Sequence, residues 1–186
     1  MCRQGRIEVV AGGMFSGKTE ELIRRLGRAV IAKKAVGVFK HSLDDRYSEE
    51  NLGSHAGQTL KARPYKSLKN LEKAVRGHQV IGIDEAQFFD DELVAYCEQW
   101  AAIGLRVIVA GLDMDSDGVP FGPMPKLMAV ADEVLKLHAV CMVCGGDATH
   151  SFHKGGKDGI VEVGVTPYEA RCRKHWLEGR KALLSG

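Results

Sequence analysis

The sequence lacks any apolar run that approaches the roughly 18 to 20 residues needed for a membrane-spanning helix. Its first residues also lack the charged and then apolar pattern of a secretion signal. A formal net charge of +2 gives no strong excess of either sign, and no dense basic or aromatic stripe is present. We therefore expect a cytoplasmic protein that binds neither membranes nor nucleic acid.

The length and the cysteine count narrow the possibilities further. A chain of 186 residues suits one compact domain, or a main domain with a small appendage, and disfavours two large independent domains. Five cysteines is an odd number. In a reducing compartment, clustered cysteines are more often metal ligands than disulfides. We interpret the isolated Cys2 and Cys97 as a terminal thiol and a small buried residue.

One glycine-framed stretch has the spacing G-x-x-x-x-G-K-[ST] of a phosphate-binding loop, Gly12-Gly13-Met14-Phe15-Ser16-Gly17-Lys18-Thr19. The outer glycines allow the backbone to turn sharply and aim several N–H groups at one point. Lys18 is placed to neutralise the β- and γ-phosphates of a nucleoside triphosphate, and the Thr19 hydroxyl to bind Mg²⁺. The alternative is a glycine-rich turn that matches by chance. The strand-like 6–11 before it and the helical spacing of 19–34 after it favour the phosphate loop.

A second motif supplies acidic groups. The β-branched run 79–83 ends in Asp84 and Glu85, followed by Ala86-Gln87-Phe88-Phe89. The carboxyl end of a neighbouring parallel strand can bring a carboxylate beside a phosphate loop. Asp84 is then the candidate magnesium partner and Glu85 the candidate base, the alternative for each being a surface carboxylate at a strand end.

Strands alternate with helices along the first 140 residues, which predicts a mainly parallel sheet with right-handed crossovers. We expect an α/β fold: a RecA-like P-loop domain over 1–140, followed by a small zinc-ribbon-like β-subdomain over 141–186. The polar stretch 41–58 is either a functional surface loop or a solvated linker. Further strands are predicted over 35–40, 60–64, 105–110 and 134–140, and helices over 68–75, 91–103 and around 128–131.

The C-terminal part carries a C-x2-C and a C-x2-H pair separated by 27 residues, Cys141, Cys144, Cys172 and His175. Three thiolates and one imidazole suit tetrahedral Zn²⁺, and four protein ligands leave no open position, so the site is structural. A disulfide or unrelated thiols are the alternative. Glycine-rich turns between the pairs predict a hairpin of 148–153 with 160–165. Because the ligand set is complete, we interpret His150 and His153 as exposed polar residues.

These motifs, together with Pro120-Phe121-Gly122, resemble the type II thymidine kinases, the cytosolic enzymes of bacteria and animals, from about residue 6 to residue 178. The resemblance implies ATP-dependent phosphorylation of the 5′-hydroxyl of thymidine or deoxyuridine. It also implies a zinc-held lobe and a homotetramer.

Site residues follow from the resemblance, position by position. Glu85 is similar to the base that accepts the 5′-hydroxyl proton, and Arg46 to an arginine brought to the transferring phosphoryl group, which with Lys18 completes the catalytic set. Gln87 joins Asp84 and the phosphate loop in the cofactor-binding set. The substrate-binding residues that the resemblance implies are Met14, Phe88, Leu112, Val161, Val163 and Tyr168.

The chain departs from the family at Ser116 and Asp117, where an aromatic and then a basic residue are usual. Serine cannot replace the apolar wall of an aromatic ring, so the departure bears on base binding and leaves the phosphate chemistry unchanged.

Two other functions compete with a kinase. A nucleic-acid-stimulated P-loop ATPase would use the zinc lobe to hold DNA and the acidic pair to activate water. The modest charge and short length disfavour it. A zinc-ribbon binding module with an idle nucleotide pocket is disfavoured by the intact Lys18 and Thr19.

Overall fold

The computed structural model describes residues 5–41, 51–53, 59–65, 67–155 and 167–185. Its elements are β1 (Arg6–Gly12), α1 (Lys18–Ile31), β2 (Val36–His41), β3 (Asn51–Gly53), β4 (Thr59–Lys61), β5 (Arg63–Tyr65), α2 (Leu68–Val75), β6 (Val80–Asp84), η1 (Ala86–Phe88), α3 (Glu92–Ala102), β7 (Arg106–Gly111), α4 (Met124–Val130), β8 (Glu133–Leu137), β9 (Ala139–Val140), β10 (Asp147–Ala148), β11 (His150–His153), β12 (Tyr168–Arg171) and α5 (Arg173–Ser185).

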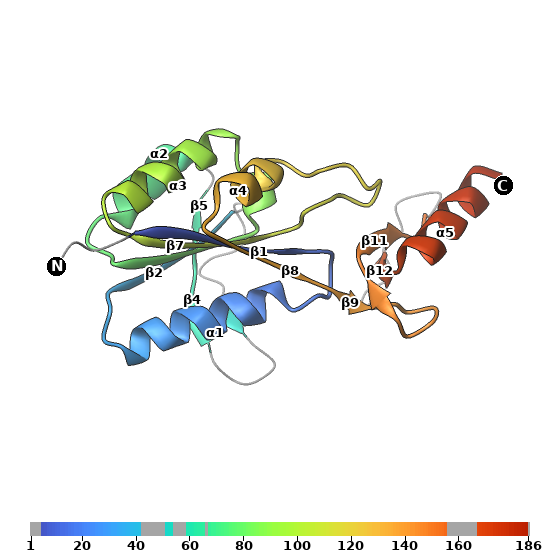
Figure 1. Ribbon diagram of the computed structural model, residues 1–186, viewed down its shortest axis with the longest axis horizontal. Coiled ribbons are helices and arrows are strands. Elements are labelled where there is room, and N and C mark those ends of the chain that lie inside the picture. Colours follow the sequence, from blue (N-terminus) through green and yellow to red (C-terminus); the bar gives the residue numbers. More distant parts are fainter. Residues whose placement is uncertain (1–4, 42–50, 54–58, 66, 156–166, 186) are drawn as a thin grey trace.

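A six-stranded sheet of order β5-β2-β6-β7-β1-β8 forms the main body. Every neighbouring pair in it is parallel, which confirms the predicted α/β class. Helix α1 covers one face, and α2, α3 and α4 cover the other (Figure 1). Because all six strands run parallel, their carboxyl ends lie at one edge of the sheet, where loops can build a site.

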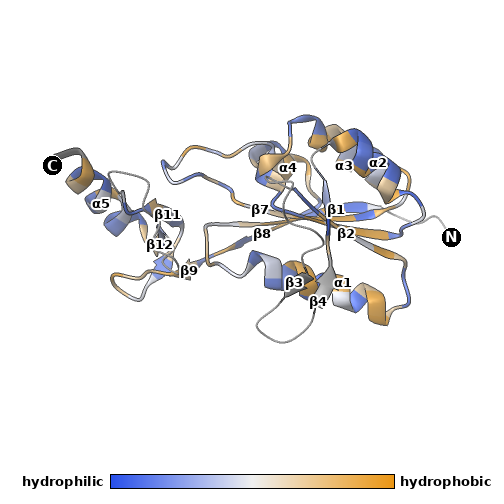
Figure 2. Ribbon diagram, turned by 180° about the vertical axis from the view of Figure 1, so that it is seen from behind, coloured by the Kyte–Doolittle hydropathy of each residue, from blue (hydrophilic) through white to orange (hydrophobic). Residues whose placement is uncertain are grey.

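Both faces of the sheet are buried, and successive residues of β1 pack on opposite faces. Val9 packs in the cluster beneath α2, α3 and α4, whereas the next residue, Val10, packs with Leu22 and Leu26 of α1. Adjacent side chains of a strand point to opposite faces, so a strand covered on both sides is continuously apolar. In Figure 2 much of the sheet is accordingly coloured hydrophobic, whereas the covering helices carry both colours.

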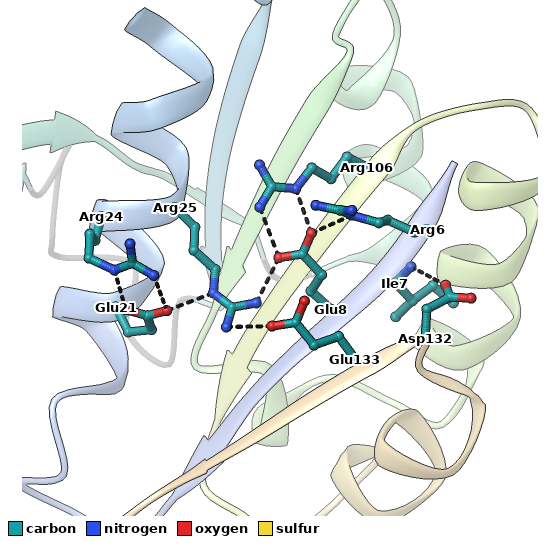
Figure 3. Close-up of polar contacts among 9 residues, drawn as sticks. All are labelled: Arg6, Ile7, Glu8, Glu21, Arg24, Arg25, Arg106, Asp132 and Glu133. Atoms are coloured by element: carbon teal, nitrogen blue, oxygen red, sulfur yellow. Dashed lines mark hydrogen bonds and ion pairs between the residues drawn. The ribbon is translucent and has the colours of Figure 1, made fainter. Parts of the chain in front are cut away.

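A network of ion pairs fixes α1 against the amino-terminal part of the sheet (Figure 3). Its centre is Glu8 on β1, whose side chain is only 1% exposed and receives Arg106 at 2.5 Å, Arg6 at 2.7 Å and Arg25 at 2.7 Å. Arg25, on α1, also pairs with Glu21 at 2.8 Å. Burial opposes ionisation of Glu8, but the hydrogen bonds and charges of the arginines outweigh it and lower its pKa from 4.5 to about 2. The carboxylate is therefore charged throughout the neutral range.

A small lobe follows the sheet at its carboxyl-terminal edge (Figure 1). The predicted strand 134–140 is divided between the two parts: β8 pairs with β1, whereas β9 pairs antiparallel with β10 in the lobe. The predicted hairpin partner 160–165 lies outside the described residues, and among the described residues β11 pairs antiparallel with β12 at 168–171. Helix α5, which the sequence analysis did not predict, closes the lobe. The helix expected around 128–131 begins earlier, at Met124.

Among the helices that the structure describes, none combines the length and the apolarity needed to cross a membrane.

Candidate active site

The predicted phosphate loop connects β1 to α1 at the carboxyl edge of the sheet. Its first glycine, Gly12, has φ 152°, and a Cβ there would lie 2.4 Å from the carbonyl oxygen of Leu137. No larger residue fits that turn. The Ser16 hydroxyl and the Lys18 ammonium donate to the Gly13 carbonyl at 2.8 and 2.7 Å. The loop is therefore folded on itself, with the amino-terminal end of α1 as its final turn, the arrangement that favours a phosphate group.

The two acidic residues at the end of β6 adopt different positions. Asp84 is 3% exposed, and its Oδ2 accepts the hydrogen bond of the Thr19 hydroxyl at 3.0 Å. Burial, then the charge of Glu85, raises the pKa of Asp84 from 3.8 to about 6. A buried carboxylate beside a threonine hydroxyl offers the hard oxygen ligands that Mg²⁺ prefers, so these two residues fit that cation.

Glu85 follows in the left-handed region, with φ 54° and ψ 38°. Such a backbone is uncommon for a residue other than glycine and recurs at functional sites. The turn directs the side chain of Glu85 into a cavity beside Lys18, whereas Asp84 stays behind the phosphate loop. The neighbouring carboxylates thereby take separate positions, one behind the phosphate loop and one in the cavity.

Gln87 lies in η1 and is 2% exposed. Its Nε2 donates to Oε2 of Glu85 at 2.6 Å, and its Oε1 accepts the backbone N–H of Leu112 at 3.0 Å. Both ends of the amide are thus engaged within the protein. Its contacts connect the candidate base to the residue that follows β7, and its place in the cofactor-binding set stays a prediction.

One cavity of about 750 Å³ opens between the phosphate loop, the loops after β6 and β7, and the lobe. Its lining comprises Met14, Phe15, Ser16, Gly17, Lys18, Thr19, Glu20, Glu85, Gln87, Phe88, Leu112, Met114, Asp115, Ser116, Phe121, Ser151 and Tyr168. It therefore brings together the phosphate loop, the candidate base and the described members of the substrate set. Arg46, Val161 and Val163 lie outside the described residues.

The cavity combines a charged part with an apolar part. Lys18 and Glu85 provide the charges, and Phe88 with Phe121 forms an edge-to-face ring pair, 5.5 Å between centroids. Rings at this separation provide a firm apolar wall. Phe121 belongs to a motif that the sequence analysis quoted without giving it a role. The sequence could have indicated a role for Phe121, because a loop that follows a parallel strand lies at the same edge of the sheet as the phosphate loop.

Ser116 and Asp117, the two residues at which the chain departs from the family pattern, lie in different surroundings. Ser116 lines the cavity, so this wall is small and polar. The exposed carboxylate of Asp117 forms a salt bridge with the guanidinium of Arg180 on α5, at 2.9 Å.

The predicted metal cluster is assembled in the lobe. The ligand atoms of Cys141, Cys144, Cys172 and His175 all lie within 4.8 Å of one another. Nδ1 of His175 lies 3.6 Å from the sulfur of Cys141 and 3.1 Å from that of Cys172. A tetrahedron with Zn–S bonds of about 2.3 Å and a Zn–N bond of about 2.0 Å places nitrogen and sulfur about 3.5 Å apart, so the cluster fits zinc. Burial alone would raise the pKa of Cys141, but three backbone N–H groups and His175 outweigh burial and lower it to about 5. The lower pKa favours the thiolate that a metal requires.

The lobe contacts the phosphate loop directly. The backbone N–H of Met14 donates to the Ser151 hydroxyl of β11 at 3.0 Å. The neighbouring His150, expected to be exposed, is 4% exposed, and its ring packs against that of Trp176 at 4.6 Å between centroids. That expectation was wrong because it allowed for no packing between the hairpin and α5. His153 is exposed, as expected.

Comparison with known proteins agrees with these motifs. The family described as "Thymidine kinase" matches residues 5–176. A protein named Thymidine kinase from Bacteroides thetaiotaomicron is 51% identical over 179 residues, which cover 96% of this chain and 90% of the relative. One of the same name from Bacteroides fragilis is 51% identical over 173 residues, 92% of this chain and 87% of the relative. The chain therefore belongs to the thymidine kinase family.

Proposed function

We propose that this protein transfers the γ-phosphate of ATP to the 5′-hydroxyl of thymidine or deoxyuridine, giving the 5′-monophosphate and ADP. The observation that carries the proposal is that Lys18 and Glu85 line the same cavity as an apolar wall. Phosphoryl transfer depends on positioning and charge neutralisation, and a nucleoside presents both a flat base and a hydroxyl.

The phosphate loop holds the triphosphate. Its backbone N–H groups face the phosphates, and Lys18 compensates their charge. Thr19 and Asp84 hold the Mg²⁺ that the family's reaction uses, and the ion, when bound, offsets charge on the phosphate oxygens. Glu85 accepts the proton of the 5′-hydroxyl as that oxygen attacks.

The acceptor lies in the apolar part of the cavity. Met14, Phe88, Leu112 and Tyr168 bind the nucleoside, and all four line the cavity. Gln87 acts through Glu85, because its amide holds that carboxylate and a backbone group of the acceptor wall at once. Arg46, Val161 and Val163 stay predictions that rest on the family resemblance.

The remaining parts of the proposal concern organisation. We infer a P-loop domain over 1–140 and a zinc-binding lobe over 141–186, with zinc in the Cys₃His cluster. We also infer a homotetramer in the cytoplasm, on the family resemblance.

The deciding assay incubates the protein with ATP, Mg²⁺ and thymidine and measures thymidine monophosphate. Glu85→Gln should leave ATP binding intact and lower turnover by about 10² or more, the effect expected for a lost general base. Glu92→Gln, the same exchange at an exposed position of α3, serves as the control. Near-normal turnover in Glu85→Gln would remove that residue from its role. ADP release that requires single-stranded DNA and ignores thymidine would indicate the ATPase instead.

A further inference from the structure

Trp176 occupies a junction between the metal cluster and the proposed acceptor cavity. It follows the cluster residue His175 directly in the first turn of α5, where its backbone N–H donates to the Cys172 carbonyl at 2.9 Å. Two cluster residues therefore determine where this indole lies. The side chain itself is 8% exposed, although it belongs to a small lobe.

The indole reaches across to the loop that follows β7. Its Nε1 donates to the backbone carbonyl of Ser116 at 3.0 Å, and Ser116 lines the cavity. Gly118 packs against the ring: it has φ 77°, and a Cβ there would lie 2.9 Å from the indole. The loop is thus fitted to the ring both by a hydrogen bond and by close packing.

Two further contacts surround the same ring. It packs against His150, whose neighbour Ser151 accepts the N–H of Met14 in the phosphate loop. The guanidinium of Arg180 lies 4.9 Å from the ring centroid. Arg180 also donates to the Asp117 carbonyl at 2.6 Å. This ring and its immediate partners therefore join the lobe to the loop after β7, which in Figure 1 extends toward the lobe.

We propose that Trp176 is a positioning residue for the nucleoside: the metal-bound turn at 172–175 holds the indole, and the indole holds the Ser116 wall of the acceptor cavity. Zinc occupancy then governs nucleoside affinity more than ATP affinity, because the phosphate loop is also held by its own bonds and by α1. The inference rests on the proposed function for the identity of the nucleoside. The link between metal and indole does not depend on it.

The first test is kinetic. Trp176→Phe keeps a ring beside His150 but removes the N–H donor and the outer edge of the indole that packs against Gly118. The KM for thymidine should therefore rise by about 3- to 10-fold, the usual effect of one lost hydrogen bond. The KM for ATP should change by less than about 2-fold. Trp100→Phe is the matched control, since Trp100 is a buried tryptophan of α3 in the main core. An equal rise for both substrates in Trp176→Phe, or the same split in Trp100→Phe, would overturn the proposal.

The second test needs no turnover. The chain has two tryptophans, so Trp100→Phe leaves Trp176 as the single reporter. Removing zinc with a chelator should shift its emission to longer wavelength as the indole meets water, and restoring Zn²⁺ should reverse the shift. Unchanged emission on complete metal removal would refute the link even if Trp176→Phe fails to fold. A protein that shows this response but makes no thymidine monophosphate would contradict the proposed function alone.

Discussion

Replacing Glu8 by glutamine tests the ion-pair network that fixes α1. The exchange conserves shape and removes one negative charge from between three guanidinium groups. A folded-state pKa of about 2, against 4.5 for the unfolded chain, corresponds to about 3 kcal/mol of stability at pH 7. The loss of stability in Glu8→Gln should stay at about 3 kcal/mol, because the arginines keep other partners or can reach water. Arg25 keeps Glu21 and Glu133 as partners, and the half-exposed Arg6 can turn toward water.

The pH dependence of the same variant gives the sharper measurement. Because the pKa of Glu8 is lower in the folded state, its contribution is fully present above about pH 4.5 and is lost as the pH falls through about 2. Urea unfolding, followed by circular dichroism, should therefore show a difference between wild type and Glu8→Gln of about 3 kcal/mol at pH 7 and about 1.5 kcal/mol at pH 3. Glu98→Gln, at an exposed position of α3, is the control. A difference below about 0.5 kcal/mol at pH 7, or one that grows on acidification, would refute the reasoning.

Two further predictions concern the site and the lobe. Gln87→Met should lower kcat by about 10- to 100-fold, because a reacting group displaced by about 1 Å can lose a factor of about 10². In a Glu85→Gln background the same exchange should cost little, since Gln87 acts through that carboxylate, and additive losses in steady-state kinetics would contradict the assignment. Elemental analysis should find about one zinc per chain, because the four ligands complete one tetrahedral site. A metal-free protein with a fully folded lobe would contradict a structural role for the cluster.

The sequence predicted the parts of the molecule that depend on local pattern. Continuous apolar strands, a glycine-framed loop and a carboxylate at a strand end led to the parallel sheet and to the placement of Thr19 beside Asp84. The paired cysteine motifs predicted the metal cluster, because their spacing already defines two turns that can share one ion. In each case short stretches of sequence contain all the residues that define the feature.

Features that arise from packing between distant segments were not predictable in the same way. The apolar run 134–140 reads as one strand, and only the three-dimensional arrangement shows that β8 joins the main sheet while β9 joins the lobe. His150 is buried because α5 covers it, and α5 itself was not predicted. Likewise, the sequence does not reveal that the amide of Gln87 contacts both Glu85 and Leu112.

The position of β1 between β7 and β8 has a consequence for how the chain is made. A ribosome delivers β1 near the start of synthesis, but its neighbours arrive only with residues 106–111 and 133–137. The Ser151 hydroxyl that accepts the Met14 N–H comes 137 residues after its donor. Through most of its synthesis the nascent protein therefore exposes an apolar, unpaired strand, the kind of segment that chaperones protect from aggregation. The phosphate loop is completed only when almost the whole protein has left the ribosome.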